Sequence, residues 1–275
     1  MLMSHVPGAL RGDVDDAHRT RVAARRLAEV LPLLRGRKAE RLHADVRQLR
    51  QVLGARRELA VALALLDEEA GRWHWAAPLV GRIRRHLEES RASIEAATEE
   101  AARAVDVPRL GRRLTRAAEL AAAEPYPELI ARLRRRRASR ELALVRAVAA
   151  AGALYDVERL HQIRIATKKL RYVLEAQIEC AGRGPVARIR ALKVLQAELG
   201  RLHDLQVLER AVRDVEGRFV SGRGRVARGL ARVGADLETE CRRLHALVLT
   251  AIRRATHGNT LAVSGAARNR RRARR

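Results

Sequence analysis

Two segments of the chain carry a histidine that is followed at helical spacing by basic side chains. The first reads AHRTRVAARRL over residues 17–27, and the second reads LHQIRIATKKL over residues 160–170. With 3.6 residues per turn, each segment gathers its basic residues on one helical face, namely His18, Arg21 and Arg25 in the first and His161, Arg164, Lys168 and Arg171 in the second. Guanidinium, ammonium and protonated imidazole groups donate charge-assisted hydrogen bonds to oxyanions. The spacing therefore predicts two helical faces that bind an anion.

The two segments belong to a longer internal repeat. Residues 13–34 align with residues 156–177 and are identical at eight of 22 positions, the histidines among them. A second pair of blocks follows in the same order, LRQVLGARRELAV at 49–61 and LQAELGRLHDLQV at 195–207. Matched blocks in one order indicate a duplicated helical unit. A basic face that only keeps a protein soluble needs no histidine at the same place twice, so the repeat favours a binding role.

The elements that must position these faces are helices. Hydrophobic periodicity, glycine and proline predict an all-α chain, with helices expected at 14–35, 38–53, 56–71, 78–104, 107–123, 127–151, 156–181, 185–199, 201–216 and 223–256. Asp13 and Asp156, each five residues before a histidine, are expected to cap the two helices that carry the basic faces. Each of these helices should bury a stripe of leucine and valine opposite its basic face.

The repeat also predicts the domain organisation. We expect two helical bundles related by a pseudo-two-fold axis, the first at residues 1–125 and the second at residues 126–257. Residues 258–275, which end in RNRRRARR, are expected to be a disordered basic tail. The net charge is +25, and removal of the six arginines of that ending still leaves +19. The tail therefore does not create the charge imbalance.

The composition limits the classes of partner. Lys and Arg number 57 against 32 Asp and Glu, and a field of this sign attracts nucleic acids, phosphate polymers or anionic membrane surfaces. No apolar run is long enough to span a membrane, and the N-terminus lacks the apolar core of a secretory signal. Cys180 and Cys241 form no CxxC pair and no disulfide framework. These features predict a cytoplasmic protein with no membrane contact.

Metal-binding and catalytic motifs are missing from the sequence. The helical neighbours of His18 are Arg21, Val22 and Arg25, and this cationic surrounding disfavours a metal ion. The chain has no phosphate-binding glycine loop, no GxSxG motif and no cysteine beside the histidines. We therefore expect no catalytic residue, no metal and no cofactor.

Two polyanions remain as ligands. Only six residues are aromatic, and none of them lies in a known RNA-binding motif, so base stacking is not expected. Sequence-independent contact with a nucleic-acid backbone stays open, because it requires only Lys and Arg. Inorganic polyphosphate offers the same charge density without bases. A long unbranched anion between two basic faces would also use both copies of the repeat at once.

The blocks AHRTRVAARRL, LHQIRIATKKLRY, LGARRELAV and LGRLHDLQV resemble the CHAD domain, the conserved histidine α-helical domain, over about residues 13–257. The resemblance implies two helical bundles with pseudo-two-fold symmetry that bind inorganic polyphosphate in a basic central groove, without catalysis. Some members associate with polyphosphate granules. Others are fused to a triphosphate-tunnel catalytic domain, whose ExExK signature is not found in this sequence.

The resemblance also implies which basic residues bind the polymer. In the first half they are His18, Arg21, Arg25, Arg26, Arg47 and Arg57. In the second half they are His161, Arg164, Lys168, Lys169, Arg171, Lys193 and His203, and the preceding arginine-rich helix adds Arg136 and Arg140. Arg57 and His203 occupy equivalent places in the two copies.

The chain departs from the family pattern at two places. Members usually begin with a further helix before the first histidine block, where this chain has only 17 residues. We expect the first bundle either to lack a helix or to fill its place with another segment. Glu58 and Ala60 also stand where the family usually has two aspartates, which leaves the helix junction at 54–60 open.

Overall fold

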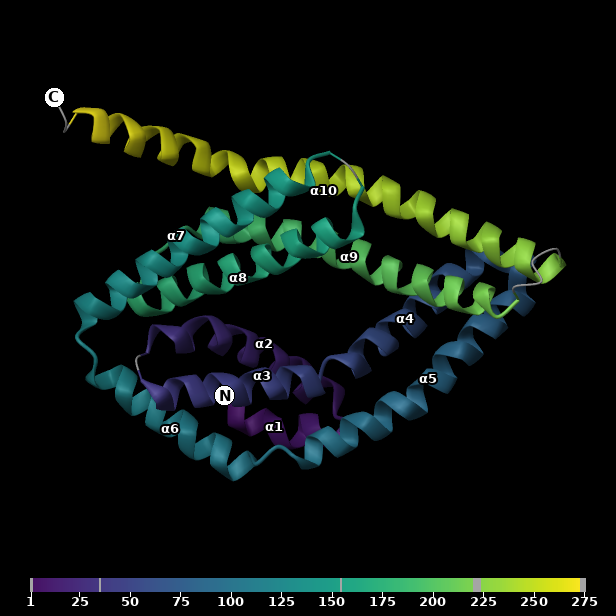
Figure 1. Cartoon of the computed structure of the whole chain (residues 1–275), viewed down its shortest axis with the longest axis horizontal. Helices are drawn as coiled ribbons and strands as arrows, with labels where there is room; N and C mark the ends of the chain where they lie inside the picture. Colours follow the sequence, from purple (N-terminus) through teal and green to yellow (C-terminus); the bar gives the residue numbers. More distant parts are fainter. Residues whose placement is uncertain (1, 35, 154, 220–223, 273–275) are drawn as a thin grey trace. The chain divides into compact units, whose positions relative to one another are not determined.

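The computed structural model describes residues 2–34, 36–153, 155–219 and 224–272, and this part of the chain is helical without a strand (Figure 1). Its α-helices are α1 (Leu2–Arg11), α2 (Val14–Val30), α3 (Arg37–Val52), α4 (Ala55–Ala70), α5 (Ala77–Arg103), α6 (Val107–Ala123), α7 (Tyr126–Ala151), α8 (Val157–Ala181), α9 (Val186–Gly217) and α10 (Arg225–Arg272). Two 3₁₀ helices, η1 (Leu31–Leu33) and η2 (Gly71–Ala76), follow α2 and α4. The predicted all-α fold is confirmed.

Three expected helix boundaries were wrong. The segments 185–199 and 201–216 form the single helix α9, because one glycine costs a helix only about 1 kcal/mol and Leu199 and Leu202 beside Gly200 are buried. The helix expected to reach residue 35 ends at Val30, where Pro32 tightens the chain into η1. Helix α10 runs through Arg272, beyond the expected end at residue 256, while the disorder expected for residues 258–275 stays a prediction.

The physical reason for the long α10 is its composition. Alanine and arginine are strong helix formers, and no proline interrupts the segment. Residues 273–275 of the expected tail lie outside the described residues.

Helix α1 fills the place before the first histidine block. It forms in spite of Pro7, because Leu2, Val6 and Ala9 are buried in the core that α1 shares with α2, α3 and α6. A hydrogen bond of 2.7 Å between His5 Nδ1 and Asp16 Oδ1 ties α1 to α2. The alternative that the first bundle lacks this helix is therefore wrong.

The chain divides into two compact units, neither of which is continuous in sequence. Unit 1 contains Met1–Arg135 and Asp204–Glu238, and unit 2 contains Arg136–His203 and Thr239–Arg275. This division differs from the expected bundles at 1–125 and 126–257, because α7, α9 and α10 each contribute to both units. At 1.5 Å per residue, the 32 residues of α9 extend about 48 Å, which is longer than the helices of one small bundle require. The pseudo-two-fold relation between the repeats stays a prediction.

Unit 1 contains two groups of packed helices. The first is formed by α1, α2, α3 and α6, and its core is built from small and branched side chains such as Ala24, Ala28, Leu42 and Val46. The buried stripe of α2 is formed by Ala24 and Ala28 more than by the expected leucine and valine, since Leu27 and Val30 are only half-buried. Small residues let α1 and α3 approach α2 closely.

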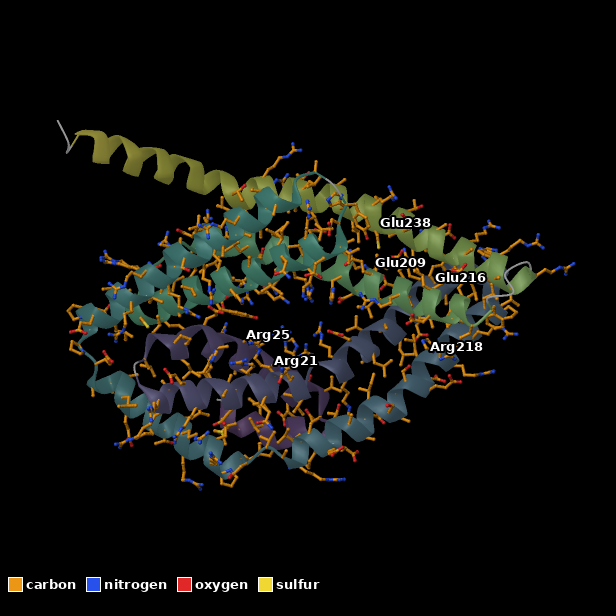
Figure 2. The ribbon with its side chains drawn as sticks, in the orientation of Figure 1. Arg21, Arg25, Glu209, Glu216, Arg218 and Glu238 are labelled. Carbon is orange, nitrogen blue, oxygen red and sulfur yellow. The ribbon has the colours of Figure 1, made fainter. Side chains whose placement is uncertain are left out.

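The second group of unit 1 combines α4 and α5 with residues 204–238 of α9 and α10. Arg218, which is labelled in Figure 2 and follows the end of α9, donates to Glu89 and lies 2.8 Å from His86 Nδ1, both on α5. Arg232 of α10 stacks on Trp75 with its guanidinium carbon 4.3 Å from the ring centroid. Arginines here serve as structural links between helices.

Unit 2 is formed by α7, α8, the first part of α9 and the second part of α10. Helix α8 is its central element, since five consecutive residues from Leu170 to Leu174 are buried. On α10, His245 is buried against Tyr155, with ring centroids 5.5 Å apart, and burial lowers the pKa of this histidine. This histidine belongs to the core and not to a binding face.

The packing of α1 on α2 generates a stability prediction. A methyl group on the buried Gly8 would lie 2.7 Å from Cγ and 3.1 Å from Cβ of Asp16. We expect Gly8→Ala to lower the free energy of unfolding by about 1–3 kcal/mol, as overpacking does. The control is Gly81→Ala in α5, whose added methyl group meets no atom within 4 Å, and which should raise that free energy by about 0.5–1 kcal/mol. Urea unfolding measures both, and stabilisation by both substitutions would contradict this packing.

Candidate functional site

The two histidine-led helices begin in the same way. Asp13 caps α2 by accepting a hydrogen bond of 2.7 Å from the Asp16 backbone N–H, and Asp156 caps α8 by accepting one of 3.0 Å from the Arg159 backbone N–H. Both predicted caps are confirmed. His18 and His161 are consequently the fifth residue of their helices, and the repeat preserves the position of each histidine relative to its helix start.

In unit 1 the first histidine lies at a cavity of about 480 Å³ between α2, α4 and α5. Its basic lining residues are His18, Arg21, Arg56, Arg57 and Arg91. The rest of the lining is largely apolar, with Leu53, Leu59, Val61, Leu63 and Ile94 among the residues. The lining of the cavity therefore combines cationic and apolar side chains.

The turn at Leu53 and Gly54 brings the second block of the repeat back to the histidine. Gly54 donates its N–H to the Gln51 carbonyl at 3.0 Å, so that α3 ends and α4 begins within two residues. Arg57, in the first turn of α4, thereby lines the same cavity as His18. The junction that Glu58 and Ala60 had left open is thus a tight corner at residues 53–54.

One carboxylate lines the cavity and is already paired. Glu95 accepts a hydrogen bond of 2.8 Å from Arg91 Nε and lies 3.7 Å from Arg56 Nη2. The hydrogen bond from Arg91 lowers the pKa of Glu95, so this residue stays ionised. Arg56 also packs against the turn at Gly12, where φ is +100° and an added Cβ would lie 3.0 Å from the Arg56 Cζ. Among the described residues, His18 and Arg57 form no ion pair.

The remaining basic residues expected in the first half do not line this cavity. Arg25 is half-buried on α2, where it projects beside Arg21 in Figure 2. Arg26 on α2 and Arg47 on α3 are exposed. The structure thus gathers His18, Arg21 and Arg57 around one cavity. Arg25, Arg26 and Arg47 do not line it.

In unit 2 the second histidine also meets the second block of its repeat. The His161 ring of α8 lies 5.5 Å from the His203 ring of α9, measured between centroids, with a tilt of 42° between the rings. His203 is the counterpart of Arg57. In the first copy the histidine and the basic residue of the second block line one cavity, and in the second copy their rings lie close together, each time within a single unit.

The other expected residues of unit 2 differ in exposure. Arg164, Lys168 and Lys169 on α8 are half-buried, as are Arg136 and Arg140 on α7, whereas Lys193 on α9 is exposed. The half-buried residues have restricted side chains, which favours a preorganised anion site.

Arg171 occupies a different environment from the rest. It is buried, its Nε donates to Gln196 Oε1 at 2.8 Å, and its guanidinium pairs with Glu175. The guanidinium carbon also lies 4.3 Å from the Tyr172 ring centroid. Helical spacing predicts that Arg171 lies on the same face of α8 as His161. In the structure, Gln196 of α9 packs against that face at Arg171. Its donors are used within unit 2.

Several arginines near these faces could not be found from the repeat. Arg56 and Arg91 line the cavity with His18, and only Arg56, as the neighbour of Arg57, has a signal in the sequence. In unit 2, burial lowers the pKa of Arg188, with Arg137 adding to this shift and Glu141 opposing it. The crowding of Arg137 and Arg188 depends on how α7 packs on α9, which no sequence motif encodes.

Two further observations concern ligands and membranes. Across residues 2–34, 36–153, 155–219 and 224–272, no three His, Cys, Asp or Glu side chains gather in an arrangement that could hold a metal ion. No helix within the same residues has the length and apolar character needed to cross a membrane.

The environment of Arg171 generates a prediction that separates stability from binding. Arg171→Met removes a cation that pairs with Glu175, whose side chain is 12% exposed, so the free energy of unfolding should fall by about 3 kcal/mol. Adding Glu175→Gln should restore much of this loss, because the charge is then removed. Urea unfolding of the single and double variants measures the effect. Unchanged stability together with weaker anion binding would show that Arg171 binds the anion and has no structural role.

The comparisons with known proteins agree with this architecture. The family model of the CHAD domain matches residues 2–213, a range that includes α1. The crystal structure of the CHAD domain from the plant Ricinus communis aligns with a TM-score of 0.63 and 23% sequence identity, over 93% of this chain and 88% of that chain. The search of curated proteins found no match. Since the family model covers well over half of its residues, the chain belongs to the CHAD domain family.

Proposed function

We propose that this protein binds inorganic polyphosphate, without hydrolysing it, through the two histidine-led basic faces. The observation that carries the proposal is the convergence of the two repeat blocks in each copy. Arg57 lines one cavity with His18, and the His203 ring lies 5.5 Å from the His161 ring. Because both copies of the repeat combine a histidine with a second basic residue, they suit a ligand that presents the same group many times.

The chemistry of the faces favours phosphate groups. Arginine presents a planar fork of N–H donors that holds two phosphate oxygens at once, and lysine adds a point charge. The N–H groups at the start of α2 and α8 add to a positive potential near each histidine. The net charge of +25 draws a polyanion toward the protein from a distance.

Polyphosphate is favoured over nucleic acid because few aromatic faces are available for bases. Trp73 and Tyr172 are buried, and Trp75 already carries Arg232 on its ring. Single-stranded nucleic acids are usually held by stacking of bases on such rings. Binding to a nucleic-acid backbone through charge alone is the second candidate, supported by the same cations.

The absence of catalysis is part of the proposal. Enzymes that cleave phosphoanhydrides hold Mg²⁺ through carboxylates. The carboxylate lining the cavity at His18 is Glu95, which Arg91 and Arg56 already hold. Association with polyphosphate granules would follow from binding alone.

The first test compares two polymers of equal phosphate content. Long-chain polyphosphate should bind more tightly than DNA, and the logarithm of each affinity should fall linearly with the logarithm of the salt concentration. Fluorescence anisotropy with labelled polymers at several salt concentrations measures this. Equal affinities at every salt concentration would favour a general polyanion binder.

The second test reverses one charge in each face. Arg21→Glu with Arg164→Glu should weaken polyphosphate binding at least about 100-fold, since two charge-assisted contacts become repulsive. The matched control is Arg85→Glu with Arg146→Glu, which makes the same change in net charge at exposed positions of α5 and α7. Helical circular dichroism should persist in both variants. An equal loss of affinity in the control would show that net charge, and not these faces, governs binding.

A further inference from the structure

A second group of cations lies in unit 1, at a cavity that shares no lining residue with the cavity at His18. Helices α3 and α6 pack against each other, and the cavity between them measures about 230 Å³. Its lining contains basic residues and no acidic one, namely Lys38, Arg41, Arg109, Arg112, Arg113 and Arg116. None of them is a position that the repeat or the family resemblance implied.

Nearby carboxylates neutralise only part of this charge. Arg113 pairs with Asp45 of α3, and Arg116 lies 3.0 Å from Glu119 one turn further along α6. Within the described part of the chain, Lys38, Arg41, Arg109 and Arg112 form no ion pair. Six cations against two carboxylates leave an excess of about four positive charges around one small cavity.

The spacing of these residues concentrates the charge. Arg109, Arg112, Arg113 and Arg116 stand at i, i+3, i+4 and i+7, on one face of α6, where like charges repel each other. The buried Ala39 and Ala117 hold α3 and α6 together beneath them. These cations come from two helices and line one cavity, where a face that only serves solubility would not need to gather them. Such an arrangement stores repulsion that a bound anion relieves.

The dimensions indicate the size of the anion. At ~30 Å³ per water, a cavity of 230 Å³ has the volume of about eight waters. This is of the same order as the nine non-hydrogen atoms of pyrophosphate. Several arginine forks around one point suit two linked phosphate groups better than a single carboxylate.

We propose that the cavity between α3 and α6 is a separate binding site for a diphosphate group. The group can come from free pyrophosphate or from the diphosphate of a nucleotide. The site is independent of the histidine-led faces, and its ligand is short and not polymeric.

The experiment titrates the full chain with pyrophosphate, orthophosphate and ADP by isothermal calorimetry without divalent metal. It starts from the Arg21→Glu, Arg164→Glu variant, in which the histidine-led faces are disabled. This variant should bind one pyrophosphate per chain, and adding Arg41→Glu with Arg112→Glu should weaken that binding at least about tenfold. Adding Arg85→Glu with Arg146→Glu instead should leave it unchanged. Arg41→Gln with Arg112→Gln replaces the charge reversal if the latter unfolds unit 1.

The outcomes separate this site from the proposed function. Pyrophosphate binding that survives Arg41→Glu with Arg112→Glu, or that is already lost in the Arg21→Glu, Arg164→Glu variant, would overturn the proposal. Orthophosphate bound as tightly as pyrophosphate would overturn the diphosphate assignment. ADP bound as tightly as pyrophosphate supports a nucleotide source, and weaker ADP binding supports free pyrophosphate. Long-chain polyphosphate should still bind when only Arg41 and Arg112 are changed, so either proposal can fail alone.

Discussion

Mutual repulsion between arginine side chains is the force that the rest of this structure must balance. The core is built from leucine, valine and alanine, with few aromatic rings to add buried area. Many arginines are therefore neutralised locally by an acid three or four residues away, as in Arg91–Glu95, Arg137–Glu141 and Arg243–Glu240. Others bridge helices, as Arg218 does with Glu89. Part of the charge that these pairs leave uncompensated lines the cavities and faces described above.

Those places have different characters. The cavity at His18 is lined by apolar and cationic side chains, and its one carboxylate is held by two arginines. The face of unit 2 consists of half-buried cations beside a pair of imidazole rings. The cavity between α3 and α6 has six cations in its lining and a smaller volume than the cavity at His18. Ligand size and charge, more than the presence of arginine, should therefore decide which site is occupied.

Much of the local structure could be predicted from the sequence. The caps Asp13 and Asp156 and most helix boundaries follow from rules that act over a few residues. Helix α1 was missed, because Pro7 and a short apolar run give no local signal and its stability comes from packing on α2. The place of Arg171 could not be found either, since helical spacing gives a direction and not the neighbour that covers it. Arg91 and the cations of α6 depend on contacts between segments far apart in the chain, which a single sequence does not contain.

The Leu-Gly pair in the second block of the repeat takes two different paths. Leu53 and Gly54 form a corner between two helices, whereas Leu199 and Gly200 lie inside the uninterrupted α9. The repeat thus keeps the spacing of side chains, whereas the path of the backbone differs between the two copies. Exchange of residues 49–61 and 195–207 would place the side chains of each block on a backbone that takes the other path. Duplicated halves of this kind can differ in backbone path and still keep similar basic side chains. Glycine allows this because its backbone can adopt either a corner or a continuous helix.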